Sequence, residues 1–183
     1  MHPRPNILVT GTPGVGKSTF CRQLAGEAGL EHIELSRLVE EEQLYTERDV
    51  HRGCTIFDEE LLLSNIEDTI HDGNKLVDFH SCDFFPDDWF DLICVLRADT
   101  EQLYDRLENR HYDQEKIGEN VQCEIFRVLL DEALETFGSD KVRELSNNTP
   151  EELDDNVETV SAWLREWKPA DKDRETRFKG SEC

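Results

Sequence analysis

The segment Ile7-Leu8-Val9-Thr10-Gly11-Thr12-Pro13-Gly14-Val15-Gly16-Lys17-Ser18 joins an apolar run to a glycine-rich turn. The apolar residues predict a short buried strand. Residues 11–18 match the pattern G-x-x-x-x-G-K-[ST] in full, and a helix is expected to begin near Lys17 and to end near Gly26 or Gly29. A strand before this pattern and a helix after it are the context in which such a loop binds phosphate, so a chance glycine-rich turn is the weaker interpretation.

This loop predicts a binding site for ATP with Mg²⁺. Glycines allow backbone N–H groups to surround phosphate oxygens, and the helix N-terminus adds partial positive charge. Lys17 is expected to reach the β- and γ-phosphates, the Ser18 hydroxyl to ligate Mg²⁺, and Thr19 to contact the α-phosphate. The predicted ATP-binding residues of this segment are Gly11, Thr12, Gly14, Val15, Gly16, Lys17, Ser18 and Thr19.

Strand signals alternate with helix signals along the chain, which predicts an α/β fold with a parallel sheet and crossover helices. After the first strand, we expect strands at residues 32–35, 76–79, 92–96 and 142–145. Helices are expected at residues 38–44, from Asp58 to Gly73, from Asp99 or Thr100, and from the Thr149-Pro150 capping box. A loose turn is expected near Arg52-Gly53. A long helix is expected to end at Gly138, with Phe126, Leu130, Ala133 and Phe137 on one face.

Asp78 and His80 are candidates for the chemistry at the end of a neighbouring strand. A loop of this kind needs an acid nearby to hold the Mg²⁺ shell, and Asp78 ends an apolar strand. His80 would lie on the same face and is a candidate to orient a water or the γ-phosphate. The alternatives are a strand-end Asp that caps a turn and a structural His.

Arg106 and Arg110 are candidates to stabilise charge on a transferred phosphoryl group. Their spacing of four places them on one helix face. They lie next to the polar stretch at residues 109–119, which has the size of a small lid. The alternative is two exposed arginines paired with Glu108 or Asp105.

The composition fits one domain at residues 1–167, followed by a polar tail at residues 168–183. A net charge of −22, from 42 acids and 20 bases, argues against generic binding to nucleic acid or anionic membranes and permits a basic protein partner. A well-solvated acidic surface explains the charge equally well. Without a long apolar run or a C-x-x-C pair, we expect a soluble intracellular protein whose six cysteines are reduced.

Together these residues resemble the adenylate kinase isoenzyme 6 family, also called coilin-interacting nuclear ATPase proteins. The most specific matches are at residues 6–17, 77–80 and 82–86, and the resemblance extends to about Trp167. It implies a three-layer P-loop nucleoside monophosphate (NMP) kinase fold with a central five-stranded parallel sheet flanked by helices. It also implies an NMP-binding segment at about residues 34–57 and a short lid at about residues 109–119. ATP contacts are implied for Gly14, Gly16, Lys17, Ser18, Thr19 and Arg110.

The resemblance further implies an adenylate kinase that also hydrolyses ATP, with AMP or another NMP as the acceptor. It implies a role in maturation of the small ribosomal subunit, including 18S rRNA processing, in the nucleus and cytoplasm. The implied partner is a basic small-subunit ribosomal protein.

The sequence departs from the family at Glu40 and Asp88, where relatives tend to carry a basic residue and an arginine. Both positions are expected to border the NMP pocket, where acids would oppose the AMP phosphate. Arg37 or Arg48 is a candidate replacement. On the acceptor side we assign Arg37, Asp83 and Phe85.

Three functions are therefore weighed. The first is an NMP kinase and the second is an ATPase assembly factor that binds a basic ribosomal protein with weak or no kinase activity. The third is a small-metabolite kinase of the shikimate type, which has less support because the acceptor region shows no basic cluster for a carboxylate.

Overall fold

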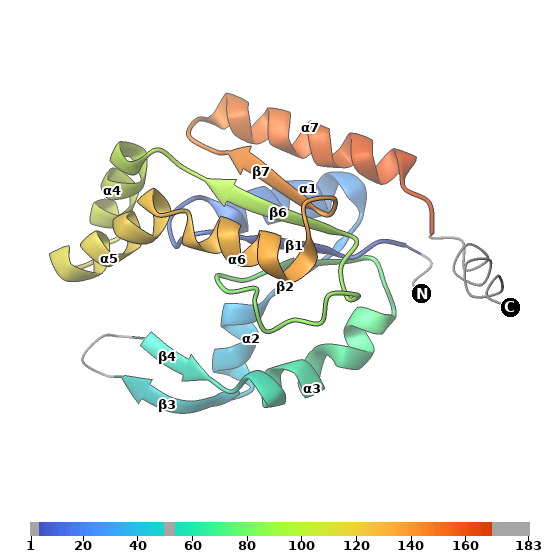
Figure 1. Ribbon diagram of the computed structural model, residues 1–183, viewed down its shortest axis with the longest axis horizontal. Coiled ribbons are helices and arrows are strands. Elements are labelled where there is room, and N and C mark those ends of the chain that lie inside the picture. Colours follow the sequence, from blue (N-terminus) through green and yellow to red (C-terminus); the bar gives the residue numbers. More distant parts are fainter. Residues whose placement is uncertain (1–3, 50–53, 170–183) are drawn as a thin grey trace, which may run out of the picture.

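The computed structural model describes residues 4–49 and 54–169 (Figure 1). Its centre is a parallel sheet of five strands in the order β2-β5-β1-β6-β7. The strands are β1 (Ile7–Thr10), β2 (Glu31–Glu34), β5 (Lys75–Asp78), β6 (Leu92–Arg97) and β7 (Val142–Ser146). The predicted fold class, a five-stranded parallel sheet flanked by helices, is confirmed.

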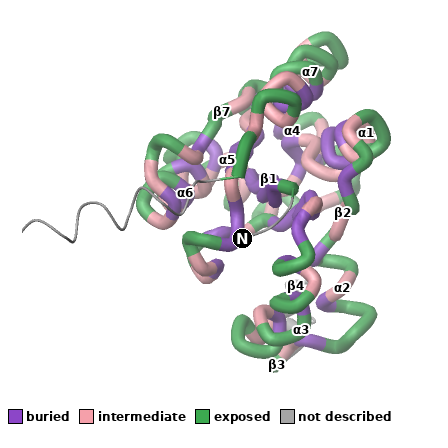
Figure 2. The backbone as a smooth tube through the Cα atoms, turned by 90° about the vertical axis from the view of Figure 1, so that its right-hand side faces the viewer, coloured by how far each residue is buried: buried purple, intermediate pink, exposed green. Residues whose placement is uncertain are grey.

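Helices cover both faces of this sheet (Figure 1). Ile7 and Val9 of β1 pack into the core that contains α1 (Lys17–Ala28) and α7 (Pro150–Glu166). Leu8 points to the opposite core, which contains α3 (Glu59–His71) and α6 (Val128–Phe137). Because alternate residues of a strand face opposite sides, a strand buried on both faces must be apolar throughout. Figure 2 shows the buried backbone concentrated in the interior of the fold.

The register of the sheet brings three strand ends together. Val9 of β1 pairs with Asp78 of β5, and Glu34 of β2 pairs with the same aspartate. In an open parallel sheet, ligands bind outside the carboxyl ends of the strands. The glycine-rich loop that follows β1 therefore begins beside Asp78.

Several predicted helix boundaries agree with the structure. α1 ends at Ala28, and Gly29 adopts the left-handed conformation with φ 69°, whereas Gly26 lies inside the helix. Asp58 caps α3 by accepting a hydrogen bond from the Leu61 N–H at 3.0 Å. Thr149 caps α7 in the same way through the Glu152 N–H at 3.2 Å.

The region between α2 (Leu35–Glu41) and α3 differs from the prediction. The helix expected at residues 38–44 begins and ends three residues earlier, and a hairpin of β3 (Tyr45–Asp49) and β4 (Cys54–Phe57) follows it. The turn predicted near Arg52-Gly53 lies outside the described residues, as does the chain from residue 170.

The long helix predicted around Phe126 is wrong. Two helices, α5 (Gln114–Ile125) and α6, are separated at Arg127, whose φ of 57° is left-handed and ends the helical hydrogen-bond pattern. Phe126 is consequently 70% exposed and not part of the core. α5 also begins within the polar stretch at residues 109–119, where no helix was predicted, because Asp113 caps its first turn. Within the described part of the chain, none of the helices is both long and apolar enough to cross a membrane.

Candidate active site

The loop between β1 and α1 has a shape that only glycine permits. Gly11 and Gly16 have φ of 144° and 100°. A Cβ atom on Gly11 would lie 2.4 Å from the Leu96 carbonyl oxygen, and one on Gly16 would lie 2.5 Å from Asn147 Nδ2. Both distances are far inside van der Waals contact, so the loop requires glycine at these two positions.

The first N–H groups of α1 are not capped by a side chain. The N-cap is Gly16, and the first turn of the helix contains no acidic residue. The first N–H groups of a helix lack intrahelical partners and carry partial positive charge. This helix end is therefore suited to bind an anion such as a phosphate group.

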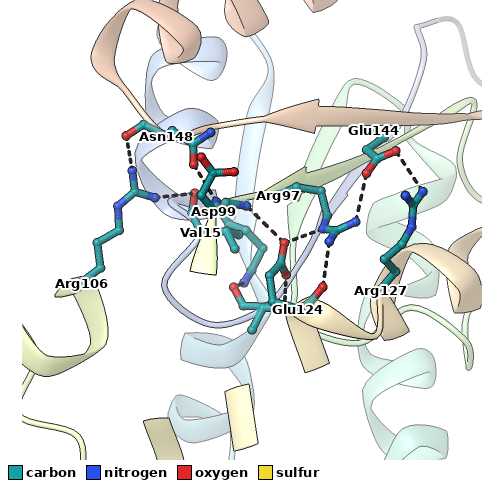
Figure 3. Close-up of polar contacts among 11 residues, drawn as sticks. Val15, Arg97, Asp99, Arg106, Glu124, Arg127, Glu144 and Asn148 are labelled. Atoms are coloured by element: carbon teal, nitrogen blue, oxygen red, sulfur yellow. Dashed lines mark hydrogen bonds and ion pairs between the residues drawn. The ribbon is translucent and has the colours of Figure 1, made fainter. Parts of the chain in front are cut away.

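A network behind the loop binds two of its carbonyl groups, those of Gly14 and Val15 (Figure 3). Asn147 Nδ2 donates to the Val15 carbonyl at 2.7 Å, and Arg106 donates to the Gly14 and Val15 carbonyls at 3.5 and 3.4 Å. Since the C=O and the following N–H of a trans peptide point in opposite directions, the Gly16 N–H faces the other side of the loop.

Arg106 is thus placed differently from the prediction. Its Nη2 atom also donates to the Asn147 and Asn148 carbonyls, at 3.0 and 2.7 Å. With its guanidinium held by four backbone carbonyls, Arg106 positions the loop and does not line the cavity. The alternative of an exposed ion pair with Asp105 or Glu108 does not describe it either.

Lys17 lies across the loop. Its Nζ donates to the Gly11 carbonyl at 2.7 Å and to the Thr12 carbonyl at 3.4 Å. Burial lowers the pKa of Lys17 to about 8, and the nearby Asp78 carboxylate opposes that shift. The ammonium is therefore charged at neutral pH and is held by weak carbonyl acceptors that a phosphate could replace.

Ser18 and Asp78 form a pair of oxygen ligands beside the loop. The Ser18 hydroxyl donates to Asp78 Oδ2 at 2.8 Å, and the Asp78 carboxylate is 3% exposed. Hydroxyl and carboxylate oxygens are the protein ligands that Mg²⁺ prefers, and Mg²⁺ usually takes only one or two from the protein. The two residues therefore fit the predicted magnesium site.

His80 lies at the cavity wall, two residues beyond Asp78. The His80 residue is exposed to solvent, yet partial desolvation at the wall and the nearby Lys17 charge lower the pKa of His80 to about 4. Its ring lies 4.4 Å from the Phe79 ring, between centroids. The imidazole is neutral at pH 7 and is able to accept a hydrogen bond.

The cavity itself has a volume of about 760 Å³. One wall is the loop with the start of α1, including Gly14, Lys17, Ser18 and Thr19. A second wall comes from α4 (Thr100–Asn109), α5 and the turn between them. A third comes from the predicted acceptor segment. The second and third walls include Arg110, Tyr112, Asp113, Glu115, Lys116, Glu119 and Asn120, and Glu34, Ser36, Val39, Glu40 and Phe57.

Three predicted ATP-binding residues lie beneath the cavity. Gly11, Thr12 and Val15 are buried and do not line it. The Thr12 hydroxyl donates instead to Glu124 Oε2 at 2.6 Å. These three residues shape the loop, and any contact that they make with ATP would come from the backbone.

The residues assigned to the acceptor side are not brought to this cavity. Arg37 is exposed and pairs with Glu41 at 2.9 Å. Asp83 is exposed and accepts from Ser81, while Phe85 is buried within an aromatic cluster with Phe84, Trp89 and Phe90. Of the two departures from the family, Glu40 lines the cavity and Asp88 does not. The side chain of Arg48 lies outside the described residues.

Sequence reasoning missed three features of the site. Arg22 and Lys116 add cations to the cavity wall, and Arg22 was detectable because it follows Ser18 by one helical turn. Glu124 is 3% exposed and pairs with Arg97, which also binds Glu144 at 3.0 Å (Figure 3). A glutamate in a polar helix carries no sequence signal of burial, so only the tertiary structure shows this network.

The fold and the site define a P-loop kinase, a phosphotransferase class that binds ATP. A family model described as an AAA domain matches residues 7–127. The chain is 47% identical over 167 residues to the adenylate kinase isoenzyme 6 homologue of Caenorhabditis elegans, covering 90% of this chain and 92% of that one. It is 41% identical to the Drosophila melanogaster homologue, with coverage of 90% and 94%. The chain belongs to the adenylate kinase isoenzyme 6 family.

Solved structures support the fold. A shikimate kinase from Bacteroides thetaiotaomicron aligns with a TM-score of 0.61 at 17% identity, covering 88% of this chain and 98% of that one. A gluconokinase from Sinorhizobium meliloti 1021 aligns with a TM-score of 0.53 at 16% identity, covering 90% and 98%. At such identities the likeness concerns the fold alone.

Proposed function

We propose that the protein transfers the γ-phosphoryl group of ATP to AMP or a related NMP, and that it hydrolyses ATP when no acceptor is bound. The observation that carries this proposal is the composition of the cavity wall. The phosphate-binding loop faces residues of both the proposed lid, at 109–119, and the proposed acceptor segment, at 34–57. A single cavity thus offers adjoining places for a donor and an acceptor, as an in-line transfer requires.

In this reaction the acceptor phosphate oxygen forms a bond to the γ-phosphorus while the bond from that phosphorus to the bridging oxygen breaks. Lys17 and Arg110 both line the cavity and supply positive charge to the transferred group. Arg110 stands at the end of α4, next to the proposed lid. Lid closure would exclude water, which favours transfer over hydrolysis.

Ser18 and Asp78 would hold Mg²⁺, which would supply charge neutralisation of the phosphates. The Ser18–Asp78 hydrogen bond keeps both oxygens oriented toward the same region. His80 is neutral at pH 7 and would orient the attacking group, or a water in the hydrolytic reaction, by accepting its hydrogen bond.

Two acidic side chains line the acceptor end of the cavity, where an AMP phosphate would bind. Glu34 and Glu40 line it on the side of β2 and α2. Carboxylates close to the AMP phosphate would weaken its binding. We therefore expect transfer to AMP with a high KM and a substantial share of ATP hydrolysis.

ATP labelled radioactively at the γ-phosphate tests this function. With AMP present, transfer places the label in ADP, whereas hydrolysis places it in inorganic phosphate. We expect labelled ADP that rises with AMP concentration. If label appears only in inorganic phosphate at every AMP concentration, the kinase assignment fails and the ATPase function remains. Lys17→Ala should lower the formation of both products by roughly 100- to 1,000-fold.

We propose as a second function an ATPase that acts in small-subunit maturation and 18S rRNA processing in the nucleus and cytoplasm. The net charge of −22 supports one part of this function, the attraction of a basic protein partner. So acidic a protein would attract a basic ribosomal protein over a range set by the salt concentration. A pull-down with basic small-subunit ribosomal proteins should show binding at low salt that weakens as salt is raised. Binding that does not change with salt would contradict the electrostatic basis.

A further inference from the structure

Three side chains with metal-binding atoms meet beside Ser18. The Cys21 thiol comes from α1, the His32 ring from β2 and the Asp78 carboxylate from β5. Their ligand atoms all lie within 4.8 Å of one another. His32 Nε2 is 3.8 Å from Asp78 Oδ2. Donor atoms at such separations need only small side-chain movements to share one ion.

His32 provides an independent reason to expect a ligand here. Its Nε2 atom is buried and has no hydrogen-bond partner. Buried polar atoms in proteins are nearly always hydrogen-bonded, so an orphan nitrogen aimed at a thiol and a carboxylate calls for an explanation. A metal ion would satisfy it.

The chemistry of the three ligands selects the kind of ion. Mg²⁺ and Ca²⁺ bind oxygen ligands, whereas thiolate and imidazole favour Zn²⁺. We propose that Cys21, His32 and Asp78 form a Zn²⁺ site, with three protein ligands and one position left for water. Binding releases the thiol proton of Cys21 to solvent, because the thiolate is the ligand.

An ion could enter through a second, smaller cavity of about 310 Å³. His32 lines this cavity together with Arg22, Glu34 and Leu38. Arg22 and Glu34 also line the main cavity, so the two spaces adjoin. The site is therefore within reach of solvent even though Cys21 is fully buried.

Zinc at this site would regulate the enzyme, an effect that rests on the proposed function. Asp78 would be shared between the Zn²⁺ site and the proposed magnesium site. Occupation by Zn²⁺ would withdraw the carboxylate from Ser18 and lower phosphoryl transfer. The binding of zinc itself does not depend on any catalytic role for Asp78.

Cobalt(II) substitution tests the binding directly. The full chain in reducing buffer is titrated with Co²⁺ and then with Zn²⁺, and the sulfur-to-cobalt charge-transfer absorption is recorded. We expect the band to saturate at one equivalent, to disappear on adding Zn²⁺, and to be lost in Cys21→Ser. His32→Gln, which changes a residue nearer the surface, should weaken cobalt binding at least tenfold. The matched control Cys123→Ser, a half-buried thiol outside the group, should retain the band.

Absence of the band in the folded wild-type protein would overturn the proposal, and so would full retention of the band in Cys21→Ser or unchanged cobalt affinity in His32→Gln. The regulatory step has its own readout. Zn²⁺ should inhibit wild-type ATP turnover at concentrations that do not inhibit His32→Gln. Equal inhibition of both proteins would refute regulation through this site. An inactive protein that still shows the cobalt band would contradict the proposed function and leave the zinc site standing.

Discussion

The buried glutamate behind the phosphate-binding loop leads to a sharp prediction. Glu124→Ala removes the acceptor of three hydrogen bonds, from Arg97 Nε, from the Ala98 N–H at 3.2 Å and from the Thr12 hydroxyl at 2.6 Å. Removing one partner of a buried ion pair costs about 3–5 kcal/mol. Arg97 keeps the Glu124 backbone carbonyl at 2.8 Å and the Glu144 carboxylate at 3.0 Å, so we expect the lower end, about 3 kcal/mol.

Thermal unfolding measures this loss. For a chain of this size each kcal/mol lowers the Tm by about 2–4 °C, so Glu124→Ala should lower it by roughly 6–12 °C. The matched control is Glu144→Gln, because Glu144 binds the same arginine but its side chain is 42% exposed. An exposed pair is worth about 0–1 kcal/mol, and the control should unfold within roughly 4 °C of wild type. Equal shifts for the two variants would refute the claim that the buried carboxylate anchors the loop.

Further predictions concern the chemistry of the cavity. Lys17→Ala should lower ATP turnover by roughly 100- to 1,000-fold in a steady-state ADP assay, and full activity would remove Lys17 from the reaction. Glu40→Gln should lower the KM for AMP by roughly threefold to tenfold, because it removes about 1 kcal/mol of repulsion between the carboxylate and the AMP phosphate. Asp88→Asn, which changes a residue outside the cavity, should leave this KM unchanged. ATP binding should take up a proton near pH 8, because the phosphates raise the Lys17 pKa above its value of about 8 in the protein without nucleotide. The affinity for ATP should therefore fall as the pH rises above about 8. Calorimetry in two buffers of different ionisation enthalpy checks this, and equal heats of binding in the two buffers would contradict it.

The parts of the fold that could be predicted depend on short-range signals. The strand, the loop and the helix at residues 7–28 follow from one apolar run, three glycines and a lysine that are contiguous in the chain. Asp58 and Thr149 cap their helices through bonds to residues three positions away. Such contacts are local, so the sequence alone carries them.

The features that escaped prediction depend on contacts between distant segments. The spacing of Arg106 and Arg110 predicts that they share a helix face, but α4 ends at Asn109. The approach of residues 147–148 and of the loop engages Arg106 with backbone carbonyls, whereas Arg110 lines the cavity. Arg127 separates α5 from α6 in a left-handed conformation that glycine usually adopts. Because arginine rarely adopts this conformation, the residue type does not predict that the helix ends here.

The central claim is that the glycine loop, with Lys17 at its edge, binds the phosphates of ATP. Titration calorimetry of the purified protein with MgATP tests it most directly. We expect saturable binding of one nucleotide, with the heat lost or strongly reduced in Lys17→Ala. Absence of any heat of association for the folded wild-type protein at two temperatures would contradict the claim.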